Sequence, residues 1–250
     1  KIVSKSFVEG FYYKPRVDLQ LLEKYKEGLI ALSACLAGEV ARYLTRGMYE
    51  DAKAAALRYQ DIFGKGNFFL ELQDHGIPEQ QNVNQQLLKM HRETGIELVA
   101  TNDVHYTLAE DAQPHDVLLC LQTGKKLSDE NRMRYDGGQY YVKSPEEMER
   151  LFPYATEALE NTHKIAQRCH VEIEFGVTKL PKFDVPQGYT SWEYLNELCF
   201  KGLEERYQPV TEELKERLNY ELATIKNMGY VDYFLIVWDF IRYARDHDIM

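Results

Sequence analysis

Side chains that bind transition metals follow three strand-like segments of the chain. They are Cys35 after residues 28–34, His75 after residues 67–72, and Asp103 with His105 after residues 98–101. Each segment is short, apolar and abruptly ended, as expected for a buried parallel strand. Barrel enzymes build their active sites where the carboxyl ends of such strands meet. A thiol, two imidazoles and a carboxylate suit zinc or a similar ion, so the pattern predicts a metal site that is sensitive to pH.

A different interpretation applies to each of these residues alone. A single histidine after a strand more commonly caps the strand end or makes a hydrogen bond within the protein. The metal hypothesis therefore depends on the three strand ends lying in register rather than on any one residue.

The elements that would position these residues alternate along the chain. Apolar residues recur at helical spacing, with start and stop signals, in residues 47–63, 78–93, 109–122, 156–168, 191–207, 212–228 and 233–247. Two capping boxes, Ser144 with Glu147 and Thr190 with Glu193, mark further helix starts. Strands and helices alternate through residue 130, which predicts α/β architecture with a parallel sheet or barrel.

The character of the chain changes after residue 170. Pro181, Pro186 and Gly188 interrupt a stretch of extended pieces, which predicts a domain junction at 171–190. The residues beyond it, 191–250, read as helical throughout.

Composition limits the possible functions. The 250 residues include 30 Lys and Arg against 40 Asp and Glu, which gives a net charge of −10. This charge argues against a generally basic surface that binds nucleic acid, but it does not exclude a local nucleic-acid channel. Four cysteines without a Cys-x-x-Cys pair favour a reducing cytoplasm. The longest apolar stretch, 233–238, is too short to span a bilayer, and no signal peptide is recognisable. The start at Lys1 predicts an internal piece of a longer protein.

Several segments resemble motifs of the bacterial DNA polymerase III alpha-subunit family, of the DnaE type. They are LSACLAGE (32–39), FLELQDHG (69–76), ATNDVHY (100–106), YVKSPEEM (141–148), LPKF (180–183) and GYVDYFLIV (229–237). The first three resemble its polymerase and histidinol phosphatase (PHP) domain, and the last resembles the start of the polymerase palm. A stand-alone PHP phosphatase is not expected to carry the last segment.

The resemblance implies a fold and a division into domains. Residues 1–170 would form the carboxy-terminal part of a distorted (β/α)7 PHP barrel, 171–190 a junction, and 191–250 a mainly helical beginning of the palm. Cys35, His75, Asp103 and His105 match positions taken as metal ligands for zinc, manganese or iron. The family's other ligands, from a His-x-His motif and later His, Asp and Glu positions, would precede Lys1.

The resemblance also implies a function. The parent would be a DNA-directed DNA polymerase whose magnesium-dependent catalytic aspartates lie beyond Met250. A metal cluster in the PHP domain would support 3′-to-5′ exonuclease proofreading, with Asp103 and His105 as catalytic residues and metals that activate a water. The implied partners are primer-template DNA, a sliding clamp and other replisome subunits, and no membrane.

Two alternatives use the same residues differently. In one, metals only stabilise the PHP domain, which docks a separate proofreading exonuclease. In the other, the protein is a stand-alone PHP phosphoesterase acting on small substrates, which the palm-like segment argues against.

Other residues carry weaker signals. Arg132 and Arg134 lie in a polar loop and are candidates for contact with DNA. Glu71 is a weaker catalytic candidate, whereas His115 and Asp116 are expected to cap or pack a helix. Aromatic residues between 230 and 243 recur at helical spacing and are expected to form core.

Overall fold

The computed structural model describes residues 1–177 and 179–249. The chain divides into two compact units, Lys1–Val171 and Glu172–Met250, and each is considered by itself. The first unit contains a small parallel sheet with helices, which confirms the α/β class predicted for this region. None of the helices in the described residues has both the length and the apolarity required to cross a bilayer.

The sheet of the first unit has three strands, β1 (Ala31–Leu32), β2 (Phe68–Leu72) and β3 (Leu98–Ala100), in the order β1-β2-β3. All neighbours are parallel, with Ala31 beside Phe68 and Leu72 beside Ala100. Every residue of β3 is buried, as expected for a strand covered on both faces. β1 is much shorter than the predicted 28–34 strand, so Cys35 lies three residues after its end.

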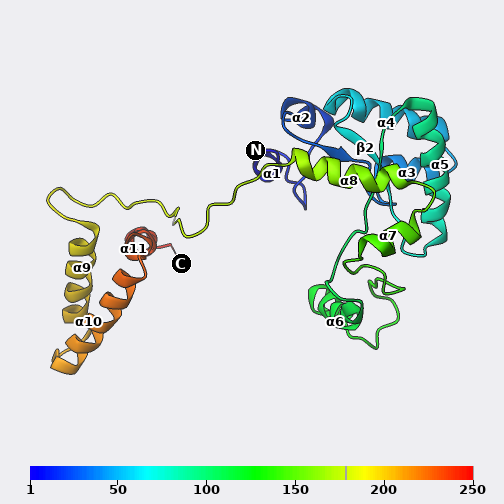
Figure 1. Ribbon diagram of the computed structural model, residues 1–250. Helices are drawn as coiled ribbons and strands as arrows, with labels where there is room; N and C mark the ends of the chain where they lie inside the picture. The colour runs from blue at the N-terminus through cyan, green and yellow to red at the C-terminus, as the bar shows by residue number, and fades with distance from the viewer. Residues whose placement is uncertain (178, 250) are drawn as a thin grey trace. The chain divides into compact units, whose positions relative to one another are not determined.

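Helices connect and cover the strands (Figure 1). Between β1 and β2 lie α3 (Glu39–Thr45) and α4 (Tyr49–Phe63), and between β2 and β3 lies α5 (Pro78–Thr94). Small residues on α4 allow close packing, since Ala52, Ala55 and Ala56 are almost fully buried. They pack with branched and aromatic residues into one core that includes Val40, Leu44, Phe68, Leu70, Leu72, Leu87, Met90, Leu98 and Phe152.

Five further helices belong to this unit in the described part of the chain. They are α1 (Ile2–Val8), α2 (Leu19–Lys24), α6 (Ala112–Thr123), α7 (Pro145–Leu151) and α8 (Thr156–Arg168), with a 3-10 turn at Ala109–Asp111 before α6. The predicted capping box starts α7, where Ser144 and Glu147 bond reciprocally. α8 packs along β3, and the buried Asn161 side chain donates from Nδ2 to the Leu98 carbonyl at 2.8 Å.

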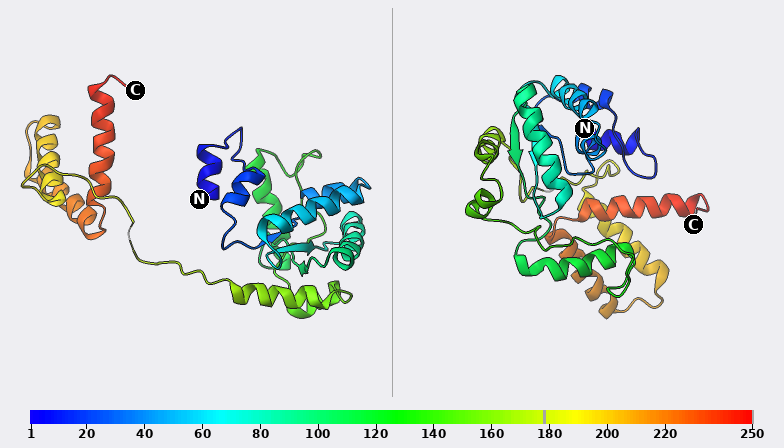
Figure 2. Two further views of the ribbon diagram at one scale, coloured as in Figure 1. Left: turned by 90° about the horizontal axis from the view of Figure 1, so that it is seen from above. Right: turned by 90° about the vertical axis from the view of Figure 1, so that its right-hand side faces the viewer.

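α6 and the loop that follows it stand apart from the sheet and its covering helices (Figures 1 and 2). The loop returns to the sheet through residues 140–142. Backbone hydrogen bonds join this segment to the chain after β3, from His105 N to Tyr140 O at 2.8 Å and from Val142 N to Thr107 O at 3.2 Å. Residues 104–143 therefore form a projecting module anchored beside the carboxyl end of β3.

The second unit contains α9 (Ser191–Arg206), α10 (Glu212–Asn227) and α11 (Val231–Asp246), drawn in yellow to red in Figure 2. Thr190 and Glu193 form the predicted capping box of α9. Leu195, Leu222 and Leu235, one from each helix, form the centre of its core. The expectation that the aromatic residues between 230 and 243 form core is wrong for most of them, since the exposed side chains include Tyr230, Tyr233, Phe234, Phe240 and Tyr243.

Candidate functional site at the strand ends

Glu71, the last but one residue of β2, ties the carboxyl ends of all three strands together. Its Oε2 accepts from the backbone N–H of Ala34, which follows β1, at 3.1 Å. Its Oε1 accepts from Thr101 Oγ1, which follows β3, at 2.5 Å and from Gln73 Nε2 at 3.1 Å. The carboxylate is thus a hydrogen-bonded hub, in contrast to the free catalytic carboxylate considered from the sequence.

Cys35 is exposed in the turn between β1 and α3. The residue before it, Ala34, has a left-handed backbone with φ of 66°, which residues with a Cβ rarely adopt. Cys35, Glu71 and Gln73 border a recess of about 10 Å³, enough for about one water molecule. Gln73 Oε1 is buried without a hydrogen-bond partner in the protein, so this acceptor is available to such a water.

His75 is buried, and both of its ring nitrogens are engaged. The Gln80 side chain accepts from the His75 backbone N–H through Oε1 at 2.8 Å, so its amide must donate to His75 Nδ1, at 2.9 Å. The His75 Nε2–H then donates to the Asn102 carbonyl at 2.9 Å. In this arrangement neither nitrogen has a free lone pair for a metal, and His75 joins the ends of β2 and β3.

His105 is exposed and has the opposite arrangement. Its Nδ1–H donates to the backbone carbonyl of Asp103 at 2.7 Å, which leaves the Nε2 lone pair free in the neutral ring. Asp103 itself has a left-handed φ of 43°, a conformation that Asp tolerates better than most residues. A histidine fixed through Nδ1 with Nε2 free is oriented as metal-binding and proton-accepting histidines are.

Aromatic rings line this part of the site. Tyr140 is buried and stacks on His75, with ring centroids 4.0 Å apart and planes 13° apart. It also meets His105 edge-on at 5.5 Å, while Tyr135 lies 4.3 Å from the same imidazole. Burial and then the nearby Asp103 carboxylate raise the pKa of Tyr140 above its ordinary value. Neither tyrosine was a candidate from the sequence, where only their place in a polar loop could be read.

Lys143 is a second residue that the sequence did not single out. Its half-buried ammonium group donates to the Gln139 carbonyl and lies 4.2 Å from the centroid of the Tyr141 ring. Burial lowers its pKa below the ordinary value for lysine, although Glu147 and Asp74 oppose the change. The Asn102 side chain donates to the Tyr141 carbonyl at 2.5 Å, so this segment is attached to the end of β3.

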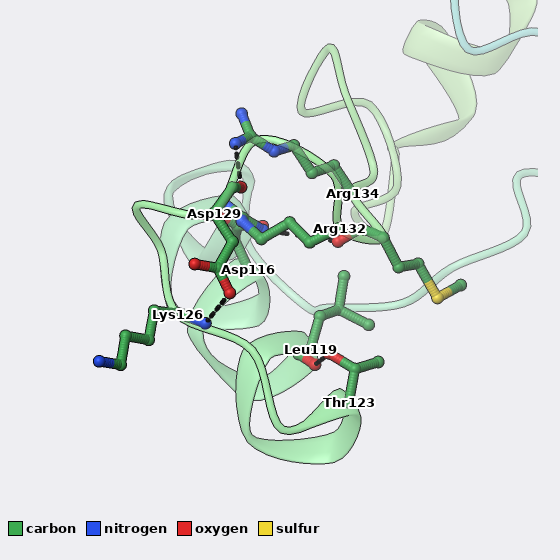
Figure 3. A network of polar contacts seen from close by, with 8 residues as sticks. Asp116, Leu119, Thr123, Lys126, Asp129, Arg132 and Arg134 are labelled. Atoms are coloured by element: carbon green, nitrogen blue, oxygen red, sulfur yellow. Dashed lines mark hydrogen bonds and ion pairs between the residues drawn. The ribbon is translucent and has the colours of Figure 1, made fainter.

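The two candidate DNA-binding arginines differ in their surroundings (Figure 3). The Arg132 side chain is 3% exposed and pairs with Asp116 on α6. Arg134 is exposed and donates to the Asp129 carbonyl at 3.2 Å. Only Arg134 is placed with a guanidinium group that DNA can reach without rearrangement of the loop.

The four predicted metal ligands therefore lie at one edge of the sheet but do not form a complete metal centre. Among the described residues, no group of three or more His, Cys, Asp and Glu side chains is placed to hold a metal ion. His105 has a ligand-like orientation and Cys35 is exposed, whereas His75 is committed to hydrogen bonds. These residues alone do not fit the implied zinc, manganese or iron cluster.

Comparisons with known proteins identify the class first. Residues 1–75 match the PHP domain family, and residues 193–250 match the family described as bacterial DNA polymerase III alpha NTPase domain. Both matches lie in one chain, the first at its start and the second at its end.

Full-length relatives identify the family. The chain is 47% identical to the DNA polymerase III subunit alpha of Treponema pallidum (strain Nichols) over 98% of this chain and 21% of the relative. It is 47% identical to that of Borreliella burgdorferi (100% and 22%) and 36% identical to that of Thermus aquaticus (100% and 25%). The chain belongs to the DNA polymerase III alpha family and spans between a fifth and a quarter of the length of these relatives.

Proposed function

We propose that this chain is a segment of a replicative DNA-directed DNA polymerase. The observation that carries the proposal is the identity of 36–47% to DNA polymerase III alpha subunits over 98–100% of the chain. Residues 1–170 would contribute the later part of a (β/α)7 PHP barrel, 171–190 a junction and 191–250 the start of the palm. The substrates of the whole polymerase would be primer-template DNA and deoxynucleoside triphosphates, with magnesium bound outside this chain.

Within that polymerase, we propose that the strand-end site contributes to 3′-to-5′ proofreading. Two observations support it. The Nε2 atom of His105 is free to accept a proton or a metal, and Asp103 precedes it by two residues in a loop with left-handed backbone. Because the described donors do not complete a metal centre, a zinc, manganese or iron cluster would need further ligands, and no catalytic step is derived through one.

A docking role is the second candidate. Its support is that Glu71 and His75 occupy their polar atoms in joining the strand ends, as residues of a rigid scaffold do. In that case the PHP unit would bind a separate proofreading exonuclease and perform no hydrolysis. The sliding clamp and other replisome subunits are partners of the whole polymerase in either case.

Degradation of a primer with a mismatched 3′ end separates the two roles. The wild-type polymerase that contains this chain would be compared with its Asp103→Ala and His105→Gln variants, with manganese or zinc added and other nucleases removed. If the site proofreads, both variants lose degradation and keep primer extension. Absence of degradation by the wild type, with binding of a separate exonuclease, supports the docking role instead.

A further inference from the structure

The loop after α6 is held to that helix by a partly buried ion pair between Arg132 and Asp116 (Figure 3). Arg132 Nη1 lies 2.5 Å from Asp116 Oδ1, and Arg132 Nη2 lies 2.7 Å from Asp116 Oδ2. Two parallel hydrogen bonds of this kind fix the orientation of a guanidinium group as well as its position. The Arg132 side chain is 3% exposed, and its Nε–H is buried without a partner in the protein. Arg132 is therefore committed to the interior of the projecting module.

The ion pair adjoins the residues that surround His105. His115 directly precedes Asp116 on α6, and Tyr135 follows Arg132 by three residues in the loop. The rings of His115 and Tyr135 meet edge-on with centroids 5.3 Å apart. Both also contact the His105 imidazole, Tyr135 at 4.3 Å and His115 at 5.7 Å between centroids. Each partner of the ion pair thus has a near neighbour in the chain, His115 or Tyr135, whose ring contacts His105.

Besides the ion pair, Tyr135 is held by an edge-on contact with the buried Tyr140, 4.9 Å between ring centroids. Residues 124–144 contain no helix or strand, and Gly137 and Gly138 both have positive φ, so the backbone is permissive there. The other polar contacts drawn in Figure 3 join neighbours within the loop or within α6, such as Lys126 N to Asp129 Oδ2 at 3.0 Å. The ion pair spans 16 residues and connects the loop to the helix.

We propose that Arg132 and Asp116 are positioning residues for His105. They hold Tyr135 and His115 against the imidazole, so that its Nδ1–H stays on the Asp103 carbonyl and its Nε2 faces outward. The inference rests on the proposed function only in treating His105 as the working group of the strand-end site. The proposal places Arg132 in the interior of the module rather than on a surface that binds DNA.

The test compares Arg132→Gln with Arg134→Gln in the full chain. The control arginine lies in the same loop but is exposed and bonds only a backbone carbonyl. Long-range proton–nitrogen NMR spectra report which ring nitrogen of His105 carries the proton, and peptide mapping reports how fast diethyl pyrocarbonate modifies it. We expect Arg132→Gln to remove the excess of the Nδ1–H form and to speed modification of His105, and Arg134→Gln to change neither.

A second variant keeps the test decisive if Arg132→Gln does not fold. Tyr135→Leu leaves the ion pair intact but removes the ring that contacts His105, so it should produce the same two changes. The double variant should then exceed Tyr135→Leu only by the smaller effect of His115, the other ring that the pair holds against His105. An unchanged His105 in Tyr135→Leu overturns the proposal. Neither readout measures nuclease activity, so failure of the proofreading assay would leave this result standing, and the reverse also holds.

Discussion

The ring of His75 stacks on the ring of Tyr140, with centroids 4.0 Å apart and planes inclined by 13°. The two residues lie 65 positions apart, His75 after β2 and Tyr140 in the segment that returns from the α6 module. The stack therefore joins the module to the sheet. Because both ring nitrogens of His75 are also bonded, the residue has the contacts of a structural element of the site.

Replacing His75 tests this assignment. We expect His75→Ala to lower the unfolding free energy of the first unit by about 3 kcal/mol, because it leaves the Gln80 amide and the Asn102 carbonyl without partners. The measurement is urea denaturation followed by circular dichroism, with and without a metal chelator. His163→Ala is the matched control, since His163 is exposed on α8 and should change stability by less than about 0.5 kcal/mol. A loss that vanishes in chelator would identify His75 as a metal ligand instead.

The Glu71 hub gives a second prediction. Glu71→Gln keeps the shape of the side chain but replaces one acceptor oxygen by an amide N–H₂. That group would face hydrogen-bond donors, either the Ala34 N–H or the Thr101 hydroxyl and Gln73 amide. We expect a loss of about 2 kcal/mol in unfolding free energy. Glu97→Gln is the control and should be nearly neutral, since Glu97 is exposed and lies directly before β3. Equal effects of the two substitutions would contradict the role of Glu71 as the tie between strand ends.

Acid should weaken the module through Asp116. The hydrogen bonds from Arg132 are the main cause that holds the pKa of Asp116 below its ordinary value, with smaller contributions from the charges of Arg132, Arg134 and His115. A carboxyl group with a lowered folded pKa stabilises the protein above its unfolded pKa, near 3.9, and loses that contribution as the pH falls through the folded pKa.

The corresponding measurement is the melting temperature of wild type and Asp116→Asn between pH 7 and pH 2. We expect the wild type to be the more stable at neutral pH and the two curves to converge at the acidic end. A constant gap between them across this range would show that ionisation of Asp116 contributes nothing.

Arg132 and Arg134 should have separate effects on DNA binding by the whole polymerase. If Arg134 contacts a phosphate, Arg134→Gln weakens binding at all sequences and reduces the slope of log affinity against log salt by about 1. Arg132→Gln should leave that slope unchanged, since its guanidinium is buried against Asp116. Fluorescence anisotropy at several salt concentrations measures both. A reduced slope for Arg132→Gln would place that residue on the DNA path.

The parts of this fold that could be predicted are those fixed by neighbouring residues. The capping boxes of Ser144 with Glu147 and of Thr190 with Glu193 are local hydrogen-bond patterns, and the structure contains both. The three parallel strands also follow from short apolar runs separated by helices, although only two residues of the first run pair as strand.

The site could be predicted only in part because its chemistry depends on distant partners. The sequence shows that His75 follows a strand, but its proton position is decided by Gln80 and by the Asn102 carbonyl. Likewise, Arg132 and Asp116 lie 16 residues apart, and nothing local distinguishes Arg132 from Arg134. Tyr140 belongs to the site because the chain returns there from the module, which no spacing rule predicts.

The Asn161 amide of α8 has a consequence for self-association. Leu98 presents its carbonyl on the side of β3 that does not face β2, where the edge of a sheet can pair with another chain. Asn161 occupies that carbonyl, and α8 covers the strand along its length. The amide therefore blocks the place where a foreign strand would begin to add. Loss of this one side chain would free the Leu98 carbonyl as the first acceptor for a foreign strand whenever α8 is not yet packed on β3 during folding.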